Sequence, residues 1–234
     1  MFDSASVQAR LIGVRERIAR AAGRAGRDPA SIRLIAVSKT FSPDHVRAAA
    51  DAGQVDFGEN KVQEGLDKMA RTADLSLRWH LIGHLQSNKV RKAAQFHALH
   101  SLDAVSLLEK LEEAAGSAKR PIEVLIQVDM AGEPTKHGAR PEDVLPILTA
   151  ARSCRSAQVA GLMLLPRAVD VPEKARPSFA ALRAFRDRLV ADGADPDLLS
   201  ELSMGMSHDF EVAIEEGATS VRIGSAVFGP RAWA

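Results

Sequence analysis

Short apolar segments alternate with capped, amphipathic helices from residue 33 to near the end of this 234-residue chain. The expected strands cover residues 33–39, 54–58, 78–83, 97–102, 122–129, 158–165, 201–206 and 220–224. Such alternation is typical of βα units around a parallel sheet, and about eight strands is the number that closes a barrel. We therefore predict an α/β fold, a single TIM-like (β/α)8 barrel over about residues 33–230.

An extra helix is expected ahead of the first strand. Apolar residues recur at helical spacing over residues 5–22, namely Val7, Leu11, Val14 and Ile18. The other face of this segment is rich in arginine, which indicates a solvated helix surface in preference to a nucleic-acid site. No linker or low-complexity stretch interrupts the pattern, so we expect one domain over residues 1–234.

The charge balance excludes several classes of partner. Lysine and arginine total 31 against 30 for aspartate and glutamate, a formal charge of +1, so no overall field attracts nucleic acid or an anionic membrane. No apolar run approaches the ~18 residues of a membrane span, and the first residues lack a secretion-signal pattern. We expect a cytoplasmic protein and, because no exposed apolar stripe stands out, a monomer.

Lys39 stands at the end of the first expected strand. Side chains on a strand alternate between faces, so Lys39 shares a face with Ile35 and Val37. Desolvation beside apolar neighbours lowers the pKa of an ammonium group, and a neutral amine condenses with an aldehyde to form a Schiff base. Lys39 is therefore a candidate Schiff-base lysine. The alternative is an ordinary lysine at a strand end that reaches solvent.

The last two strands are followed by residues suited to an anion. In a (β/α)8 barrel, the loops after strands 7 and 8 form the usual phosphate site. Ser207 offers a hydroxyl beside backbone N–H groups, Gly224 lets the backbone approach closely, and Ser225 adds a second hydroxyl. We predict phosphate binding at these residues. The alternative is that Ser207 or His208 only caps a helix and that Gly224 only serves packing.

Arg222 is expected to point into the barrel. It alternates with Val221 and Ile223 on the eighth strand, and it shares its face with Gly224. An inward arginine needs an acceptor, and a heteroaromatic ring nitrogen would serve, because a guanidinium leaves that nitrogen unprotonated. The alternative is an ion pair inside the barrel with Asp129 or Glu201.

Two further residues are candidates near the ends of the strands. Asn60 follows the second strand and is a candidate cofactor contact, although it is equally a candidate helix cap. Lys136 lies on the loop over residues 129–140 and is a candidate second, mobile amine. We predict no metal site, because no carboxylate or thiol at ligand spacing completes the histidine pairs His80/His84 and His97/His100.

Six segments, taken in order, resemble the pyridoxal phosphate homeostasis protein family. They are Ala36-Val-Ser-Lys39, Phe57-Gly-Glu-Asn60, Trp79-His-Leu-Ile-Gly83-His-Leu-Gln86-Ser-Asn-Lys89, Gly161-Leu-Met163, Ser203-Met-Gly-Met-Ser-His-Asp209 and Arg222-Ile-Gly-Ser-Ala-Val-Phe-Gly229. The match runs from the first strand to the last. Lys61 stands where many relatives carry tyrosine or another basic residue, and Ser225 stands where many carry threonine, so that its hydroxyl is retained.

The resemblance implies an alanine racemase-like, fold-type III barrel that binds pyridoxal 5'-phosphate (PLP). It implies that Lys39 forms the Schiff base and that Ser207, Gly224 and Ser225 hold the phosphate. It also implies that Arg222 faces the pyridine nitrogen, in agreement with the alternation along the strand.

A PLP site leaves the choice between a carrier and an enzyme. The chain contains no tyrosine, whereas racemases of similar barrel fold take a second acid–base tyrosine from an additional C-terminal domain, and only residues 225–234 follow Gly224 here. An arginine at the ring nitrogen also weakens the electron sink. We expect a non-catalytic protein of PLP homeostasis that passes PLP to apo-enzymes. The alternatives are a small PLP-dependent racemase or lyase, and a phosphate-binding aldolase that uses Lys39.

Overall fold

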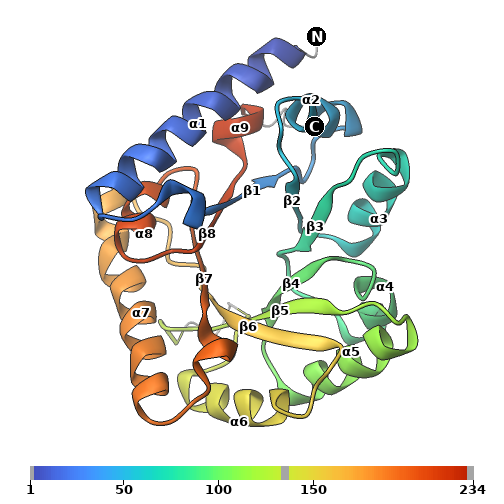
Figure 1. Ribbon diagram of the computed structural model, residues 1–234, viewed down its shortest axis with the longest axis vertical. Helices are drawn as coiled ribbons and strands as arrows, with labels where there is room; N and C mark the ends of the chain where they lie inside the picture. The colour runs from blue at the N-terminus through green and yellow to red at the C-terminus, as the bar shows by residue number, and fades with distance from the viewer. Residues whose placement is uncertain (1–2, 133–136, 231–234) are drawn as a thin grey trace.

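The computed structural model describes residues 3–132 and 137–230. Within these residues, eight parallel strands pair in chain order and β8 pairs back with β1, which closes a barrel (Figure 1). The strands are β1 Arg33–Val37, β2 Asp56–Glu59, β3 Arg78–Leu81, β4 Ala98–Leu102, β5 Ile122–Gln127, β6 Ala157–Met163, β7 Glu201–Met206 and β8 Ser220–Ile223. The predicted (β/α)8 fold is confirmed.

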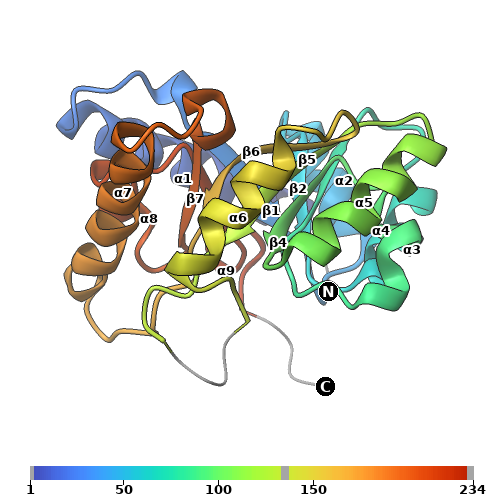
Figure 2. The same ribbon diagram turned by 90° about the horizontal axis from the view of Figure 1, so that it is seen from below.

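Helices surround the strands on the outside of the barrel (Figure 2). They are α1 Ser4–Arg24, α2 Pro43–Asp51, α3 Val62–Arg71, α4 Val90–Ala93, α5 Val105–Ser117, α6 Pro141–Ala151, α7 Arg176–Ala191, α8 Phe210–Glu215 and α9 Ser225–Phe228. Four short 3-10 turns, at Pro29–Ser31, Ser87–Lys89, Pro172–Ala175 and Pro196–Leu199, join the described elements. Pro141 begins α6 and Pro177 lies in the first turn of α7, as their fixed φ angles favour. Among the described residues, no helix is both long and apolar enough to cross a membrane.

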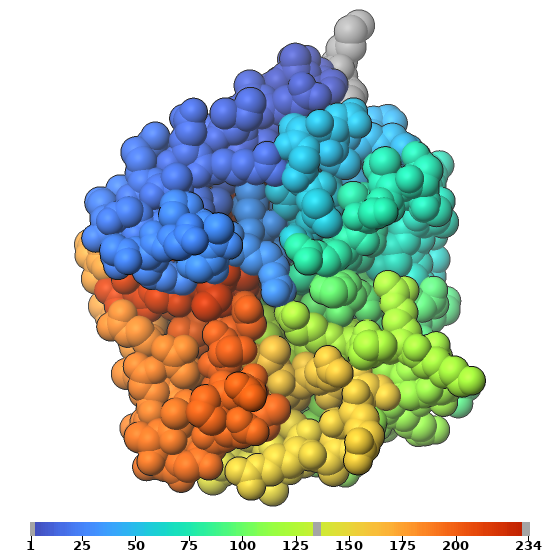
Figure 3. All heavy atoms as spheres, in the orientation of Figure 1, coloured from blue at the N-terminus to red at the C-terminus, as the bar shows by residue number. Residues whose placement is uncertain are grey.

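The additional helix α1 packs across the place where the chain closes on itself. Asp3 caps its start, and its predicted apolar stripe is buried. The stripe packs the helix against α2, α8 and α9, and Figure 3 shows the blue N-terminal and red C-terminal segments side by side on the surface. Two of its arginines, Arg17 and Arg24, pair with carboxylates of α8 at 3.0 and 2.7 Å. The arginine-rich face therefore partly serves intramolecular contacts.

α3 starts later than the sequence predicts. Its first residue is Val62 and Lys61 occupies the cap position, so the expectation that Asn60 caps this helix is wrong. Close packing of two loops explains the difference. A Cβ added at Gly83 would lie 2.3 Å from the backbone oxygen of Asn60, so Asn60 stays in the loop against β3 instead of entering the helix.

α8 also starts later than predicted. Asp209 occupies the cap position, so neither Ser207 nor His208 caps this helix. The Asp209 carboxylate accepts the N–H of Met206 at 2.7 Å and thereby closes a tight turn at the end of β7. This turn leaves the Ser207 hydroxyl available for contacts with β8.

The two faces of the barrel wall differ in chemistry. Apolar side chains such as Leu34, Ala36 and Phe57 fill the layer between strands and helices. Barrel interiors are usually filled by branched apolar residues, but this interior also contains a set of buried polar side chains, namely Asp56, His80, His100, Ser203, Ser220 and Arg222. Burying so many polar groups is costly unless they are hydrogen-bonded, and such a set marks the interior as a region of functional interest.

Candidate functional site

A pocket of about 880 Å³ opens at the C-terminal ends of the strands. This is the end of a (β/α)8 barrel where ligands bind. The described candidate residues of the sequence all line this one pocket, namely Lys39, Asn60, Ser207, Arg222, Gly224 and Ser225. They come from the ends of β1, β2, β7 and β8, so the chain brings its beginning and its end together here.

Lys39 lies two residues after the end of β1 and is half-buried at the pocket wall with Val37 and Phe41. Its position agrees with the predicted alternation, because Ile35 and Val37 lie on the inner side of β1 beside Gly58 of β2. Residue Thr40 then turns the chain out of the barrel with φ of 70°. A positive φ is unfavourable for a β-branched residue, so surrounding contacts must hold this turn.

Those contacts come from a charged cluster on the outside of the barrel wall, which we call the lysine clamp: Glu59, Glu64 and Lys68. The Lys68 ammonium donates to the Ser38 carbonyl at 2.7 Å and to carboxylate oxygens of Glu59 at 2.6 Å and Glu64 at 2.9 Å. Glu64 in turn accepts the N–H of Thr40 at 2.7 Å. The clamp therefore holds the residues on both sides of Lys39.

Two of the three clamp residues are deeply buried. Lys68 is 5% exposed and Glu59 is fully buried, and Glu59 also accepts the Ser38 hydroxyl at 2.7 Å. Its second oxygen, Oε2, has no hydrogen-bond partner among the described residues. Burial raises the pKa of Glu59. The sequence did not reveal this cluster, because Glu64 and Lys68 are spaced like an ordinary exposed pair on a helix.

Ser207 and Gly224 form a cradle of hydrogen-bonding groups between the last two strands. The Ser207 hydroxyl accepts the backbone N–H of Gly224 at 3.1 Å and of Ala226 at 3.3 Å. A Cβ added at Gly224 would lie 3.3 Å from the Val37 carbonyl oxygen, so a larger residue would crowd β1. N–H groups and hydroxyls gathered in this way suit an anion with several oxygens.

Arg222 is 3% exposed and lies inside the barrel below this cradle. It donates to the Ser203 hydroxyl at 2.6 Å and to the Leu164 carbonyl at 2.8 Å. Burial lowers its pKa to about 10, which still leaves the guanidinium charged near neutrality. Among the described residues it forms no ion pair with Asp129 or Glu201, and Glu201 faces Arg33 instead. The ion-pair alternative is therefore wrong.

These groups can be tested against a phosphorylated heteroaromatic aldehyde. The pocket offers an amine for the aldehyde after β1, a charged donor for a ring nitrogen on β8, and a cradle for the phosphate between the ends of β7 and β8. The donor set therefore fits PLP.

Sequence comparison supplies the family. The family model described as "Alanine racemase, N-terminal domain" matches residues 11–232. The chain is 43% identical to the pyridoxal phosphate homeostasis protein of Aquifex aeolicus, covering 95% of this chain and 97% of that one. It is 44% identical to the protein of that name from Pseudomonas aeruginosa, covering 93% of each. The chain belongs to the pyridoxal phosphate homeostasis protein family.

The family assignment extends to solved structures. PipY of Synechococcus elongatus, solved with PLP bound, is 37% identical and superposes with a TM-score of 0.84, over 95% of this chain and 100% of that one. The family resemblance that the sequence motifs suggested is thus confirmed, as is the alanine racemase-like barrel.

Several histidines near the site offer ring nitrogens that could in principle bind a metal ion. His80 and His100 hydrogen-bond to each other at 3.0 Å, which occupies ring nitrogens that a metal would need. At the pocket entrance, ligand atoms of His84, Asp103 and His137 lie within 4.8 Å of one another. The rings of His84 and His137 stack 3.6 Å apart and nearly parallel, so their in-plane lone pairs run side by side and do not converge on an ion.

Lys136, the candidate second amine, lies outside the described residues. The neighbouring residue His137 is described and lines the pocket. The position of Lys136 near the pocket therefore stays a prediction.

Proposed function

We propose that this protein binds PLP as a Schiff base on Lys39 and serves in PLP homeostasis or delivery without turnover of its own. The observation that carries the proposal is the convergence of Lys39, Arg222 and the Ser207–Gly224 cradle on one pocket. PLP supplies a reactive aldehyde when bound, and a carrier keeps that aldehyde from other amines. The names of the homologues and the PLP bound to PipY support this assignment.

In this proposal each part of the pocket has one task. Ser207, Gly224 and Ser225 bind the phosphate through hydroxyls and backbone N–H groups. Arg222 donates to the ring nitrogen and keeps that nitrogen unprotonated. Asn60 contacts the cofactor from the end of β2. The lysine clamp holds the Lys39 segment in place.

Two features support a carrier rather than an enzyme. The sequence contains no tyrosine that could act as a second acid–base group. A ring nitrogen that accepts a hydrogen bond from Arg222 also stabilises a carbanion poorly. The alternative of a small racemase or lyase has support in the imidazoles of His84, His137 and His208 along the pocket wall.

The Schiff base is tested by absorbance spectroscopy. Purified protein loaded with PLP is expected to absorb in the visible range, and Lys39→Ala abolishes that band. Lys61→Ala is the matched control, because Lys61 is an exposed lysine that follows the neighbouring strand. An unchanged band in Lys39→Ala, or equal loss in both variants, would contradict the proposal.

Turnover separates the carrier from the enzyme. The PLP-loaded protein is incubated with each single amino acid, and chiral chromatography follows racemisation and product formation. We expect no steady turnover of any amino acid. Sustained turnover that is lost in Lys39→Ala would establish the racemase or lyase instead.

Delivery is tested with an apo-enzyme as acceptor. We expect the loaded protein to reactivate an apo PLP enzyme in the presence of a scavenger of free aldehyde, which free PLP cannot do. Light scattering of the same sample is expected to give the mass of a monomer.

The role of Lys136 is tested by borohydride reduction followed by mass spectrometry. We propose that Lys136 receives PLP from Lys39 during release, so excess PLP should label both lysines. Label that stays on Lys39 alone would remove Lys136 from the pathway.

A further inference from the structure

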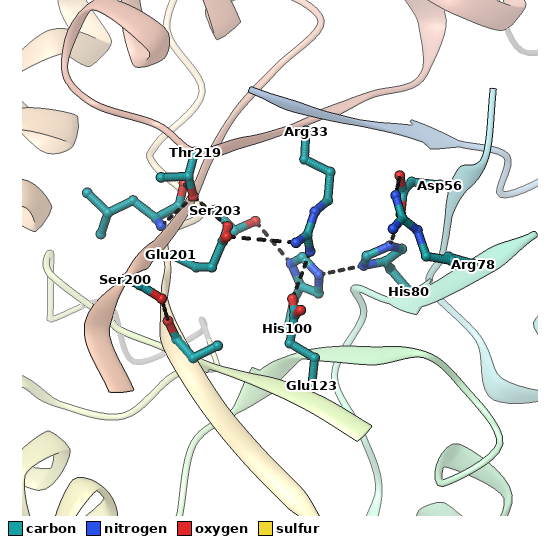
Figure 4. Close-up of polar contacts among 12 residues, drawn as sticks. Arg33, Asp56, Arg78, His80, His100, Glu123, Ser200, Glu201, Ser203 and Thr219 are labelled. Atoms are coloured by element: carbon teal, nitrogen blue, oxygen red, sulfur yellow. Dashed lines mark hydrogen bonds and ion pairs between the residues drawn. The ribbon is translucent and has the colours of Figure 1, made fainter. Parts of the chain in front are cut away.

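A chain of hydrogen bonds crosses the barrel interior from the pocket to the opposite end. Arg222 of β8 donates to the Ser203 hydroxyl of β7 at 2.6 Å, and this hydroxyl lies 3.0 Å from Nδ1 of His100 on β4. Nε2 of His100 lies 3.0 Å from Nδ1 of His80 on β3, and Nε2 of His80 lies 2.8 Å from the Asp56 carboxylate at the start of β2. Figure 4 shows the part from Ser203 to Asp56.

All five side chains are buried, with at most 6% exposure, so water does not complete these contacts. Between Arg222 and Asp56, every link joins side chains from different strands. Such a set of contacts forms only when the barrel is closed, and each lost link leaves a buried polar group without a partner.

The Asp56 end sets the direction of the bonds when each imidazole carries one proton. A carboxylate can only accept, so His80 donates from Nε2 to Asp56 and its Nδ1 accepts from Nε2 of His100. Nδ1 of His100 is then an acceptor, so the Ser203 hydroxyl donates its proton there while it accepts from Arg222. Both histidines carry their single proton on Nε2 in this arrangement.

Burial supports the neutral form at the centre of the chain. His100 is fully buried, and this burial lowers its pKa well below the ordinary value.

The Asp56 end of this series of hydrogen bonds is held by an ion pair. Arg78 donates to both oxygens of Asp56, at 2.8 and 2.6 Å. Asp56 and Arg78 line a second cavity, of about 660 Å³, that includes the first residues of β1, β3 and β7 and so opens at the N-terminal end of the barrel. The series of hydrogen bonds from Arg222 to Asp56 therefore connects the pocket with the opposite end of the barrel.

We propose that Ser203, His100, His80 and Asp56 form a one-directional hydrogen-bond relay that positions Arg222 toward the ring nitrogen of the cofactor. This inference rests on the proposed PLP site, since Arg222 acts there. The four relay members are positioning residues that touch no ligand. Their effect reaches the cofactor through the orientation of one guanidinium group.

The relay is tested first in protein without PLP. Nitrogen-15 NMR of the labelled protein reports which ring nitrogen of each histidine carries the proton. We expect the Nε2–H form for His80 and His100, and in Asp56→Asn a change of tautomer at His80, because an amide can donate as well as accept. The Nδ1–H form of His100 in the wild-type protein would overturn the one-directional arrangement.

The second test compares two buried serines that face each other across β7 and β8. Ser203 and Ser220 are paired in register, but the Ser220 hydroxyl has no hydrogen-bond partner among the described residues. Ser203→Ala is expected to raise the dissociation constant for PLP about tenfold, the usual effect of one lost buried hydrogen bond, and to shift the absorption maximum of bound PLP. Ser220→Ala should leave the constant within about twofold and the spectrum unchanged.

Equal spectra and equal dissociation constants in the two serine variants would overturn the relay as a positioning device. Circular dichroism of both variants shows whether each is folded. If Ser203→Ala is unstable, Ser203→Cys takes its place in the test. The thiol retains a weak donor and acceptor, so this variant is expected to keep part of the affinity for PLP. A protein that binds no PLP would refute the proposed function, whereas the tautomers in the cofactor-free protein would still decide the relay.

Discussion

Two polar networks support the pocket from opposite sides of the barrel wall, and they handle buried charge differently. In the lysine clamp, outside the strands, Lys68 contacts two carboxylates directly, at 2.6 and 2.9 Å. In the relay, inside the strands, the positive charge of Arg222 is separated from Asp56 by Ser203, His100 and His80.

The difference predicts how each network fails. Removing one member of a directly paired, buried cluster leaves an uncompensated charge, which is strongly destabilising. Removing a neutral link of the relay leaves one unsatisfied hydrogen-bonding group, which costs less. The clamp therefore fixes the fold around Lys39, whereas the relay adjusts the orientation of one side chain.

The largest effect is expected from breaking the clamp. Lys68→Met leaves Glu59 buried without its ammonium partner and should lower the free energy of unfolding by about 3–5 kcal/mol. Urea unfolding followed by circular dichroism measures this loss. Lys61→Met, at an exposed lysine, is the control and should change stability by less than about 0.5 kcal/mol. If Lys68→Met lowers the free energy of unfolding by less than about 1 kcal/mol, the clamp does not cost more to break than the relay.

Acid should weaken the relay at its far end. Burial by itself would raise the pKa of Asp56, but hydrogen bonds from His80 and Arg78 lower it from 3.8 to about 2. A depressed pKa gives stability that is present above the unfolded-state pKa and is lost as the pH falls toward 2. Between pH 5 and pH 2, the wild-type protein should lose about 2 kcal/mol more than Asp56→Asn. The exposed variant Asp51→Asn should follow the wild-type curve.

The clamp should respond to acid with the opposite sign. Burial raises the pKa of Glu59, so its charged form is disfavoured in the folded state at neutral pH. As the pH falls through that raised pKa toward 4.5, the wild-type protein should gain stability relative to Glu59→Gln, by about 1.4 kcal/mol for each unit of the shift. Unfolding curves at pH 7 and pH 4.5 measure the difference. A relative loss in this range would show that the contact with Lys68 outweighs burial.

The smallest effect concerns the turn that the clamp holds. Thr40 has φ of 70°, a conformation that glycine adopts readily and that is sterically unfavourable for a β-branched residue. Thr40→Gly should raise the free energy of unfolding by about 0.5–1 kcal/mol. The strain removed from the turn in the folded state is expected to exceed the conformational entropy that glycine adds to the unfolded chain. Thr149→Gly, in the exposed part of α6, should instead lower it by a few tenths of a kcal/mol. Equal signs in thermal or urea unfolding would show that the turn stores no strain.

Most of the fold could be predicted because local patterns determine it. The strands from Arg33–Val37 to Ser220–Ile223 read as short apolar runs between capped helices, and alternation along β1 and β8 placed Lys39 and Arg222 on the inner face. The predicted start positions of α3 and α8, with Asn60 and Ser207 as caps, were wrong. Contacts with neighbouring loops and strands, rather than local cap residues, determine where those helices begin.

The supporting networks could not be predicted for a different reason. The relay and Arg222 together join residues from five strands whose mutual register is fixed only when the barrel closes. His80 and His100 read as a weak metal signal in the sequence, and only their facing ring nitrogens show that they bond to each other. The clamp requires Glu59 of β2 to face Lys68 across the wall, which no local spacing reveals.

The placement of the pocket between β1, β7 and β8 has a consequence for protein synthesis. The residues proposed to bind the aldehyde and the phosphate lie far apart in the sequence, at Lys39 and at Ser207 and Gly224. A ribosome-bound chain that still lacks β8 has neither a closed barrel nor the cradle. A reactive vitamin derivative can therefore be captured only after β8 has been synthesised, so that loading itself reports a closed barrel.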